Sequence, residues 1–152
     1  MDITLVNYMK EQLRLVNLDF KRYMYDKLPW QARFIGLMGP RGVGKSTLIL
    51  QHLKEMDADT QAKSLYISAD HSYFTTHTLI DTADQFVREG GETLYIDEVH
   101  KYDAWSRELK QIYDSHPELK IFFTGSSMLD ILDVCFSFAI DFFTHHRQVG
   151  TL

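Results

Sequence analysis

Short runs of apolar residues alternate along the chain with longer segments in which apolar residues recur every three or four positions. The runs have the length and composition of strands buried on both faces, and they are residues 33–38, 64–69, 93–97 and 120–125. The helical spacing covers residues 45–54, 79–87 and 105–113. Strands that alternate with helices in this way predict βαβ units, a mainly parallel sheet and helices on both of its faces.

Two of these helices carry recognisable end signals. Thr78 and Asp81 have the spacing of a helix start in which the first side chain caps the helix and an acidic residue lies in its first turn. The glycine pair at 90–91 stops that helix. Asp103 is a candidate N-cap for the next helix, which must end before Pro117.

Residues 3–27 also carry apolar residues at helical spacing. Asn17 interrupts the pattern, so we expect two helices there, and Pro29 disfavours helix at the residue before it. We therefore expect a single domain made of an N-terminal helical segment over 1–30, a core over 31–133 and an atypical tail over 134–152.

Composition and charge narrow the class of protein. The net charge of -5 and the pI near 5.7 argue against a broad nucleic-acid-binding face. One cysteine, Cys135, excludes an intrachain disulfide, as is typical of a reducing compartment. The N-terminus lacks the features of a signal peptide, and the most apolar stretch, residues 134–143, is about half the ~20 residues of a membrane-spanning helix. We expect a soluble, cytoplasmic protein without a membrane span.

The sequence MGPRGVGKST at residues 38–47 follows the first predicted strand and opens the first predicted helix. Residues 39–46 fit the Walker A pattern G-x-x-x-x-G-K-[ST] without a gap. Glycines let the backbone turn tightly and aim its N–H groups at phosphate oxygens, and the helix N-terminus adds positive potential. The candidate nucleotide-binding residues are Gly39, Pro40, Arg41, Gly42, Val43, Gly44, Lys45, Ser46 and Thr47.

Three side chains of this loop have specific predicted roles. Lys45 supplies a positive charge to the β- and γ-phosphates, the Ser46 hydroxyl is a ligand for Mg²⁺, and Thr47 donates to the α-phosphate. For Arg41 two interpretations stay open, a phosphate contact and a solvated loop residue.

A second acidic element follows in TLYIDEVHK, where the predicted strand 93–97 ends in Asp97 and Glu98. We predict that Asp97 holds Mg²⁺ through water, as in a Walker B element, and that Glu98 is the general base for an attacking water. The adjacent glutamate favours an ATPase over a kinase or a GTPase, and the guanine-reading sequence N-K-x-D is absent. His100, just beyond, could sense the nucleotide state or contact a neighbour, but a surface histidine is the favoured interpretation.

The fourth predicted strand ends in FFTGSS. In a parallel sheet of this kind it lies beside the strand before the glycine-rich loop. Thr124, Ser126 and Ser127 are therefore candidates to sense the γ-phosphate or position water, with Thr124 and Ser126 as the candidate catalytic residues. Ser127 is a candidate cap for a helix beginning at residue 128.

Taken together, GPRGVGKSTLILQHL, LYISADHSYF and LYIDEVHKYDAWSRELKQIYDSHPELKIFFTGSSMLDIL resemble bacterial AAA-type ATP-binding proteins of the AAA_14 group, which often carry a C-terminal DUF4143 region. The resemblance covers residues 23–133. It implies a three-layer αβα P-loop NTPase of the additional-strand class with strand order 5-1-4-3-2, and it implies ATP and Mg²⁺ as ligands. It assigns the same roles to Lys45, Ser46, Asp97, Glu98 and the 124–127 stretch.

The chain departs from that family after Asp133, where VCFSFAIDFFTHHRQVGTL replaces the expected arginine-containing segment and fifth strand. We interpret this tail as a truncated, frame-shifted or naturally short end, so that the sheet order becomes 1-4-3-2 with the fifth strand missing or replaced by the tail. Residues 134–143 could supply a substitute strand or pack against another copy. No arginine finger is identifiable.

Three functions stay open at this point. The first is a Mg²⁺-dependent ATPase whose nucleotide state biases contact with a partner, either a second copy or an unidentified protein. The second is a nucleotide-binding switch, or a remnant of an ATPase, with negligible turnover. The third is a small-molecule phosphotransferase, which would need a lid that residues 97–133 do not show.

Overall fold

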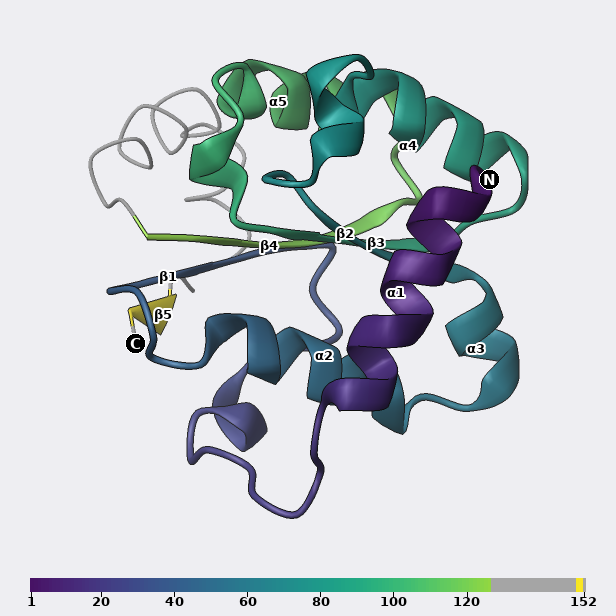
Figure 1. The fold of residues 1–152 in the computed structure, drawn as a ribbon. Helices are drawn as coiled ribbons and strands as arrows, with labels where there is room; N and C mark the ends of the chain where they lie inside the picture. Colours follow the sequence, from purple (N-terminus) through teal and green to yellow (C-terminus); the bar gives the residue numbers. More distant parts are fainter. Residues whose placement is uncertain (127–149, 152) are drawn as a thin grey trace.

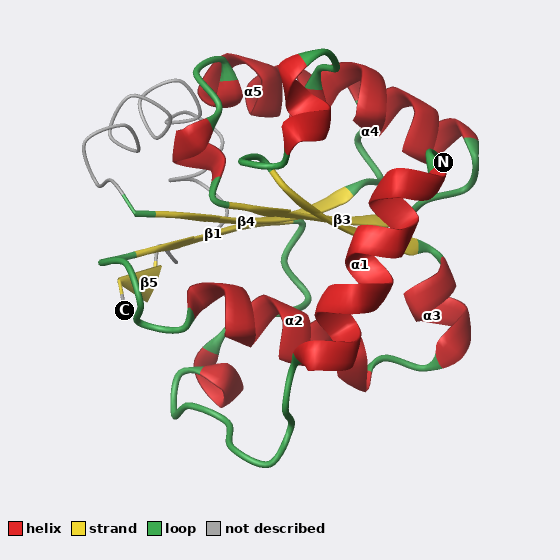
Figure 2. Ribbon diagram, in the orientation of Figure 1, coloured by secondary structure: helices red, strands yellow, loops and turns green. Residues whose placement is uncertain are grey.

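A five-stranded sheet forms the middle of the computed structural model, which describes residues 1–126 and 150–151 (Figures 1 and 2). Its strands are β1 (Phe34–Met38), β2 (Ser64–Ser68), β3 (Thr93–Asp97), β4 (Lys120–Gly125) and β5 (Gly150–Thr151). They lie in the order β2-β3-β4-β1-β5, and every neighbouring pair is parallel. The predicted α/β class, the parallel sheet and the 1-4-3-2 order are confirmed.

The fifth position of the sheet is filled from the end of the chain. β5 pairs in parallel with Leu37 and Met38 of β1. The tail therefore replaces the fifth strand, but with only two residues. The predicted use of residues 134–143 as a strand and of Ser127 as a helix cap lies outside the described residues.

Helices cover both faces of the sheet. α2 (Lys45–Glu55) and α3 (Ala58–Ala62) lie on one face, and α4 (Leu79–Arg88) and α5 (Trp105–Ser115) lie on the other (Figure 1). All five residues of β2 and of β3 are buried, as strands covered on both faces should be. The short 3₁₀ turns of the described part are η1 (Tyr25–Lys27), η2 (Ser72–Thr75) and η3 (Val99–Lys101).

The N-terminal helix α1 (Ile3–Leu15) packs against β2 and reaches α2 (Figure 1). β2 is an edge strand, and an edge strand presents backbone groups that need cover. The backbone N–H of Tyr66 points at the sulfur of Met9, 3.3 Å away, and the ring of Tyr8 stacks on that of Tyr66. α1 thus closes this edge of the sheet.

The second predicted N-terminal helix was wrong. After α1 the chain is irregular as far as η1, because its carbonyl groups bond to side chains of α2 instead of to helical N–H groups. Lys54 donates to the carbonyl of Val16 (2.7 Å), and the amide of Gln51 donates to those of Asn17 and Phe20 (2.8 and 2.7 Å). These hydrogen bonds hold the segment 16–24 against α2.

The helix-end signals were partly right. Thr78 caps α4 by accepting the backbone N–H of Asp81 (3.0 Å), and Gly90 follows that helix with a left-handed φ of 89°. The prediction that Asp103 caps α5 was wrong. The residue before α5 is Ala104, which makes no side-chain cap, because the chain enters the helix through a backbone turn in which Trp105 donates to the carbonyl of Tyr102.

Candidate functional site

The loop 39–47 lies at the carboxyl ends of the central strands. Register pairing places Met38 of β1 beside Gly125 of β4, and Gly39 donates to the carbonyl of Gly125 (3.4 Å). β3 lies on the other side of β4, so the acidic pair that follows it faces the same edge. Three segments far apart in sequence therefore meet here, where parallel α/β folds bind ligands.

The glycines of the loop adopt the conformation that their motif requires. Gly42 and Gly44 have φ values of 83° and 87°, a left-handed region that side chains with a Cβ enter only at a cost. Gly44 is the residue before α2, so the N–H groups of the first turn of that helix face the loop. Of the predicted loop residues, Pro40, Arg41, Gly42 and Thr47 are exposed, whereas Val43, Gly44 and Ser46 are half-buried and Gly39 and Lys45 are buried.

Lys45 is the buried cation of this site, with a relative exposure of only 4%. Its ammonium donates to the carbonyls of Gly39 and Pro40, each at 2.8 Å. In the part of the chain that the structure describes, no carboxylate pairs with it. The loop thus holds a positive charge whose hydrogen-bond partners are neutral oxygens.

Asp97 is the centre of a cluster of hydroxyl groups. Its Oδ1 accepts from the Ser46 hydroxyl (2.9 Å) and from Thr124, and its Oδ2 accepts from Tyr66 (2.7 Å). Burial beside the Asp97 carboxylate raises the pKa of Tyr66 far above its ordinary value, so this hydroxyl stays a proton donor. The predicted residues Ser46, Asp97 and Thr124 are therefore brought together, and Tyr66 was missed because nothing local in the sequence marks it.

Glu98 has a special backbone conformation. Among the described residues it is the only one besides glycine with a positive φ, 55°. Its backbone N–H donates to the Thr124 hydroxyl (3.0 Å), which holds this turn against the end of β4. Strained conformations of this kind cluster at functional sites. The Thr124 hydroxyl thus bonds both members of the acidic pair.

His100 links Glu98 to Ser126 and is not the surface residue that the sequence suggested. Its side chain is 14% exposed, and its Nε2 lies 3.4 Å from Oε2 of Glu98. Its Nδ1 accepts the backbone N–H of Ser126 (3.1 Å), so in this arrangement Nε2 carries the ring proton and donates to the Ser126 hydroxyl (2.9 Å). Two predicted site residues are thus joined through a third.

Arg22 is a further residue that the sequence did not indicate. Its guanidinium lies against Gly44, since a Cβ built on that glycine would be 2.8 Å from Nε of Arg22. Arg22 lies here because the segment 16–24, of which it is part, is hydrogen-bonded to α2. By contrast Arg41, within the loop itself, is exposed and has no hydrogen bond or ion pair to any described residue, which fits its interpretation as a solvated residue.

No group of three or more His, Cys, Asp or Glu side chains among the described residues could hold a metal ion. None of their helices is both long enough and apolar enough to cross a membrane.

Comparison with known proteins gives a match to a family model and similarities to solved structures. A family model described as "AAA domain" matches residues 31–136. A solved structure, titled "Structure of C. elegans PCH-2", is 22% identical with a TM-score of 0.47, and the match covers 86% of this chain and 39% of that chain. This chain therefore spans well under half the length of that protein. No curated protein matches.

Proposed function

The chain belongs to the AAA domain family, and from that premise we propose that it binds ATP and ADP at residues 39–47 and hydrolyses ATP with Mg²⁺. The observation that carries the proposal is the buried ammonium of Lys45, which bonds to two neutral carbonyls beside the start of a helix. A buried charge is costly unless an opposite charge compensates it. The terminal phosphates of a nucleotide would supply that charge, and the N–H groups of α2 would bind the same anion.

The residues beside Lys45 fit Mg²⁺. The ion prefers oxygen ligands, keeps several of its waters and uses few protein ligands. The Ser46 hydroxyl and the Asp97 carboxylate lie 2.9 Å apart beside the loop. We assign Ser46 as a direct ligand and Asp97 as a partner of the ion's water. When bound, Mg²⁺ neutralises charge on the phosphates.

Glu98 is the residue that we assign as general base. It would accept a proton from the attacking water, while Thr124 keeps its backbone and the Asp97 carboxylate in place. Ser126 lies at the end of the strand beside the loop, and we assign it as the γ-phosphate sensor. Because Ser126 contacts His100 and His100 contacts Glu98, a change in the contacts of Ser126 when it binds the γ-phosphate would be transmitted to Glu98.

Binding is tested by calorimetric titration with Mg·ATP, Mg·ADP and Mg·GTP. We expect ATP and ADP to bind more tightly than GTP, and Lys45→Ala to weaken binding at least a hundredfold, because a charge-assisted contact is lost. Lys110→Ala is the matched control, since this lysine pairs with Asp114 on α5 and carries the same charge. A well-folded chain that binds none of these nucleotides would refute the proposal.

Hydrolysis is tested separately by phosphate release. Glu98→Gln should keep the nucleotide affinity of the unaltered chain and lower its rate at least a hundredfold. If the unaltered chain binds ATP but releases no phosphate above background, hydrolysis is refuted and the nucleotide-binding switch is the function that survives. Self-association and a protein partner stay predictions.

A further inference from the structure

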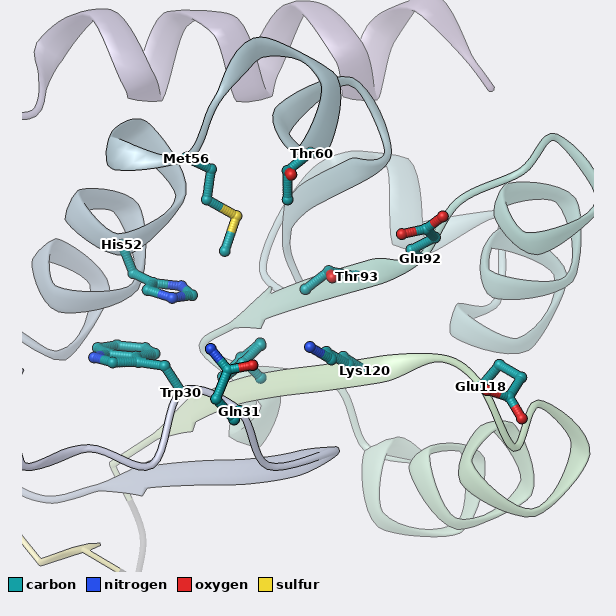
Figure 3. A pocket seen from close by; sticks show the side chains of 10 residues that line it. Trp30, Gln31, His52, Met56, Thr60, Glu92, Thr93, Glu118 and Lys120 are labelled. Atoms are coloured by element: carbon teal, nitrogen blue, oxygen red, sulfur yellow. The ribbon is translucent and has the colours of Figure 1, made fainter.

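A second candidate site, formed by a cavity, lies at the opposite end of the sheet from the loop 39–47. It has a volume of about 460 Å³, within the range of small-molecule sites, and it opens between α2, α3 and the amino ends of β3 and β4 (Figure 3). Thr93 and Lys120, the first residues of those two strands, line it. The site described above uses the other ends of the same strands.

One wall of this cavity is aromatic and firmly held. The rings of Trp30 and His52 stack with centroids 3.9 Å apart and planes 8° apart, and Phe122 lies 5.6 Å from His52. The indole N–H of Trp30 donates to the carbonyl of Tyr25 (2.8 Å), and Nδ1 of His52 lies 3.0 Å from the hydroxyl of Tyr95. Burial lowers the pKa of His52 to about 4, so this wall is uncharged near neutral pH.

Three hydrogen-bond donors face the cavity without a partner among the described residues: the Lys120 ammonium, the Thr93 hydroxyl and the Gln31 amide. In Figure 3 all three lie near the middle of the pocket. Thr93 is only 6% exposed, yet no buried side-chain polar atom of the described residues lacks a hydrogen bond, so its hydroxyl must be open to the cavity. Half-buried Lys120 is the one cation among the lining residues.

The acidic residues of the lining do not compensate Lys120. Glu92 lines the cavity but pairs with Lys63, at 2.9 Å, and not with Lys120. Glu118 is exposed at the outer end of the lining (Figure 3). Lys120, Thr93 and the exposed Gln31 therefore offer one positive charge and two neutral donors beside an apolar wall, to which Met56 adds its thioether.

We propose that this cavity binds a small organic carboxylate with a flat apolar body, of the class of the aromatic carboxylates. The single charge of a carboxylate matches the single ammonium of Lys120, and its two oxygens have enough lone pairs for all three donors. The apolar body packs against Met56 and the edges of the aromatic wall. A ligand with an amino group in place of the carboxylate would instead bring a second positive charge beside the Lys120 ammonium.

The test is titration of the ¹⁵N-labelled chain with benzoate, benzylamine and benzyl alcohol. The indole N–H signal of Trp30, distinguished from that of Trp105 by the Trp105→Phe variant, reports the cavity. We expect a saturable shift with benzoate, and affinities for the amine and the alcohol at least tenfold weaker. No saturable shift with benzoate, or equal binding of benzylamine, overturns the proposal.

Variants locate the anion within the cavity. Lys120→Met should weaken benzoate binding at least tenfold, and Thr93→Val about fivefold, because each removes one donor to a charged ligand. Lys110→Met, on the other face of the sheet, removes the same charge and should leave the affinity within twofold. If Lys120→Met does not fold, Thr93→Val decides alone. Unchanged affinity in a folded Lys120 or Thr93 variant places benzoate elsewhere and overturns the proposal.

The nucleotide site is tested independently of this cavity. Lys45→Ala should bind benzoate as the unaltered chain does, because no residue is shared between the two sites. Loss of benzoate binding in a folded Lys45→Ala variant would place the anion on the loop 39–47 and would overturn the proposal for the second candidate site.

Discussion

His52 is a titratable side chain that its surroundings keep neutral. Burial lowers its pKa to about 4 from an ordinary value of 6.5. Between these two pH values the unfolded chain binds a proton that the folded chain does not, so the free energy of unfolding falls as the pH falls. This contribution is complete above pH 6.5 and is lost as the pH drops toward 4. Because the ring is partly exposed, we expect the free energy of unfolding to fall by only about 1 kcal/mol between pH 7 and pH 5.

Urea unfolding at the two pH values measures this effect. His52→Gln should lower the free energy of unfolding at pH 7, because ring stacking is lost. The fall in that free energy from pH 7 to pH 5 should also be about 1 kcal/mol smaller in the variant than in the unaltered chain. The matched control is His77→Gln, which makes the same change at an exposed side chain. An unchanged pH dependence in His52→Gln would mean that the folded chain protonates this ring freely.

Tyr66 and Tyr95 allow two hydrogen bonds to be compared for their contribution to stability. The Tyr66 hydroxyl bonds to the Asp97 carboxylate, and the Tyr95 hydroxyl bonds to the neutral His52 ring. The two tyrosines are register partners on β2 and β3 with relative exposures of 1% and 0%. Tyr66→Phe should cost about 2 kcal/mol and Tyr95→Phe about 1 kcal/mol in urea unfolding at pH 7, since bonds to charged groups are stronger. Equal costs would show that water satisfies Asp97 in the variant.

At the scale of the elements, α5 caps its neighbour α4. The side chain of Glu108, on α5, is 6% exposed, and its Oε2 accepts the backbone N–H groups of Leu79 and Ile80 (3.0 and 3.3 Å). Its other oxygen accepts from Tyr102 (3.0 Å). These bonds satisfy two of the N–H groups that a helix start leaves without a partner, and they lock the two helices together over one face of the sheet (Figure 1).

Glu108→Gln tests this contact between helices. The variant keeps the shape of the side chain but turns one acceptor into a donor, so we expect a loss of about 2 kcal/mol in urea unfolding. Glu118→Gln removes the same charge from an exposed position and should stay within about 0.5 kcal/mol of the unaltered chain. A loss as small as that control's in Glu108→Gln would mean that solvent caps α4 instead.

The predictability of these elements follows from where their hydrogen bonds lie. The strands 93–97 and 120–125 were predicted to the residue, because an apolar run bounded by polar residues is a local signal. The segment 16–24 was mistaken for helix because its bonding partners are Gln51 and Lys54, far along the chain. α3 was missed: its one signal is Asp57, whose carboxylate accepts from Asp59 and Thr60, and the helix has only five residues.

The same division holds in the candidate site. The loop 39–47 and the pair Asp97–Glu98 could be found from sequence because the spacing within each motif is short and fixed. The contacts of Tyr66, His100 and Arg22 with the site depend on strand register and on the path of the N-terminal segment. No pattern along one chain encodes them.

At the scale of the whole molecule, the parallel sheet separates two sets of polar groups. β3 begins with Thr93 at the second candidate site and ends with Asp97 at the loop 39–47, which are roughly 13 Å apart at the usual rise of a strand. Sites farther apart than about 10 Å that share no residue usually contribute to stability independently. If both proposals hold, neither ligand should therefore change the affinity of the chain for the other.

This independence can be measured because each bound ligand raises the free energy of unfolding. ADP with Mg²⁺ at a hundred times its Kd should raise the free energy of unfolding by about 2.7 kcal/mol, and benzoate at ten times its Kd by about 1.4 kcal/mol. Together they should raise it by the sum to within about 0.5 kcal/mol. Lys45→Ala should lose only the first increment, and Lys120→Met only the second. A joint increment that departs from the sum by more than 1 kcal/mol would show that β3 and β4 transmit binding from one end to the other, and the independence derived from their separation would be wrong.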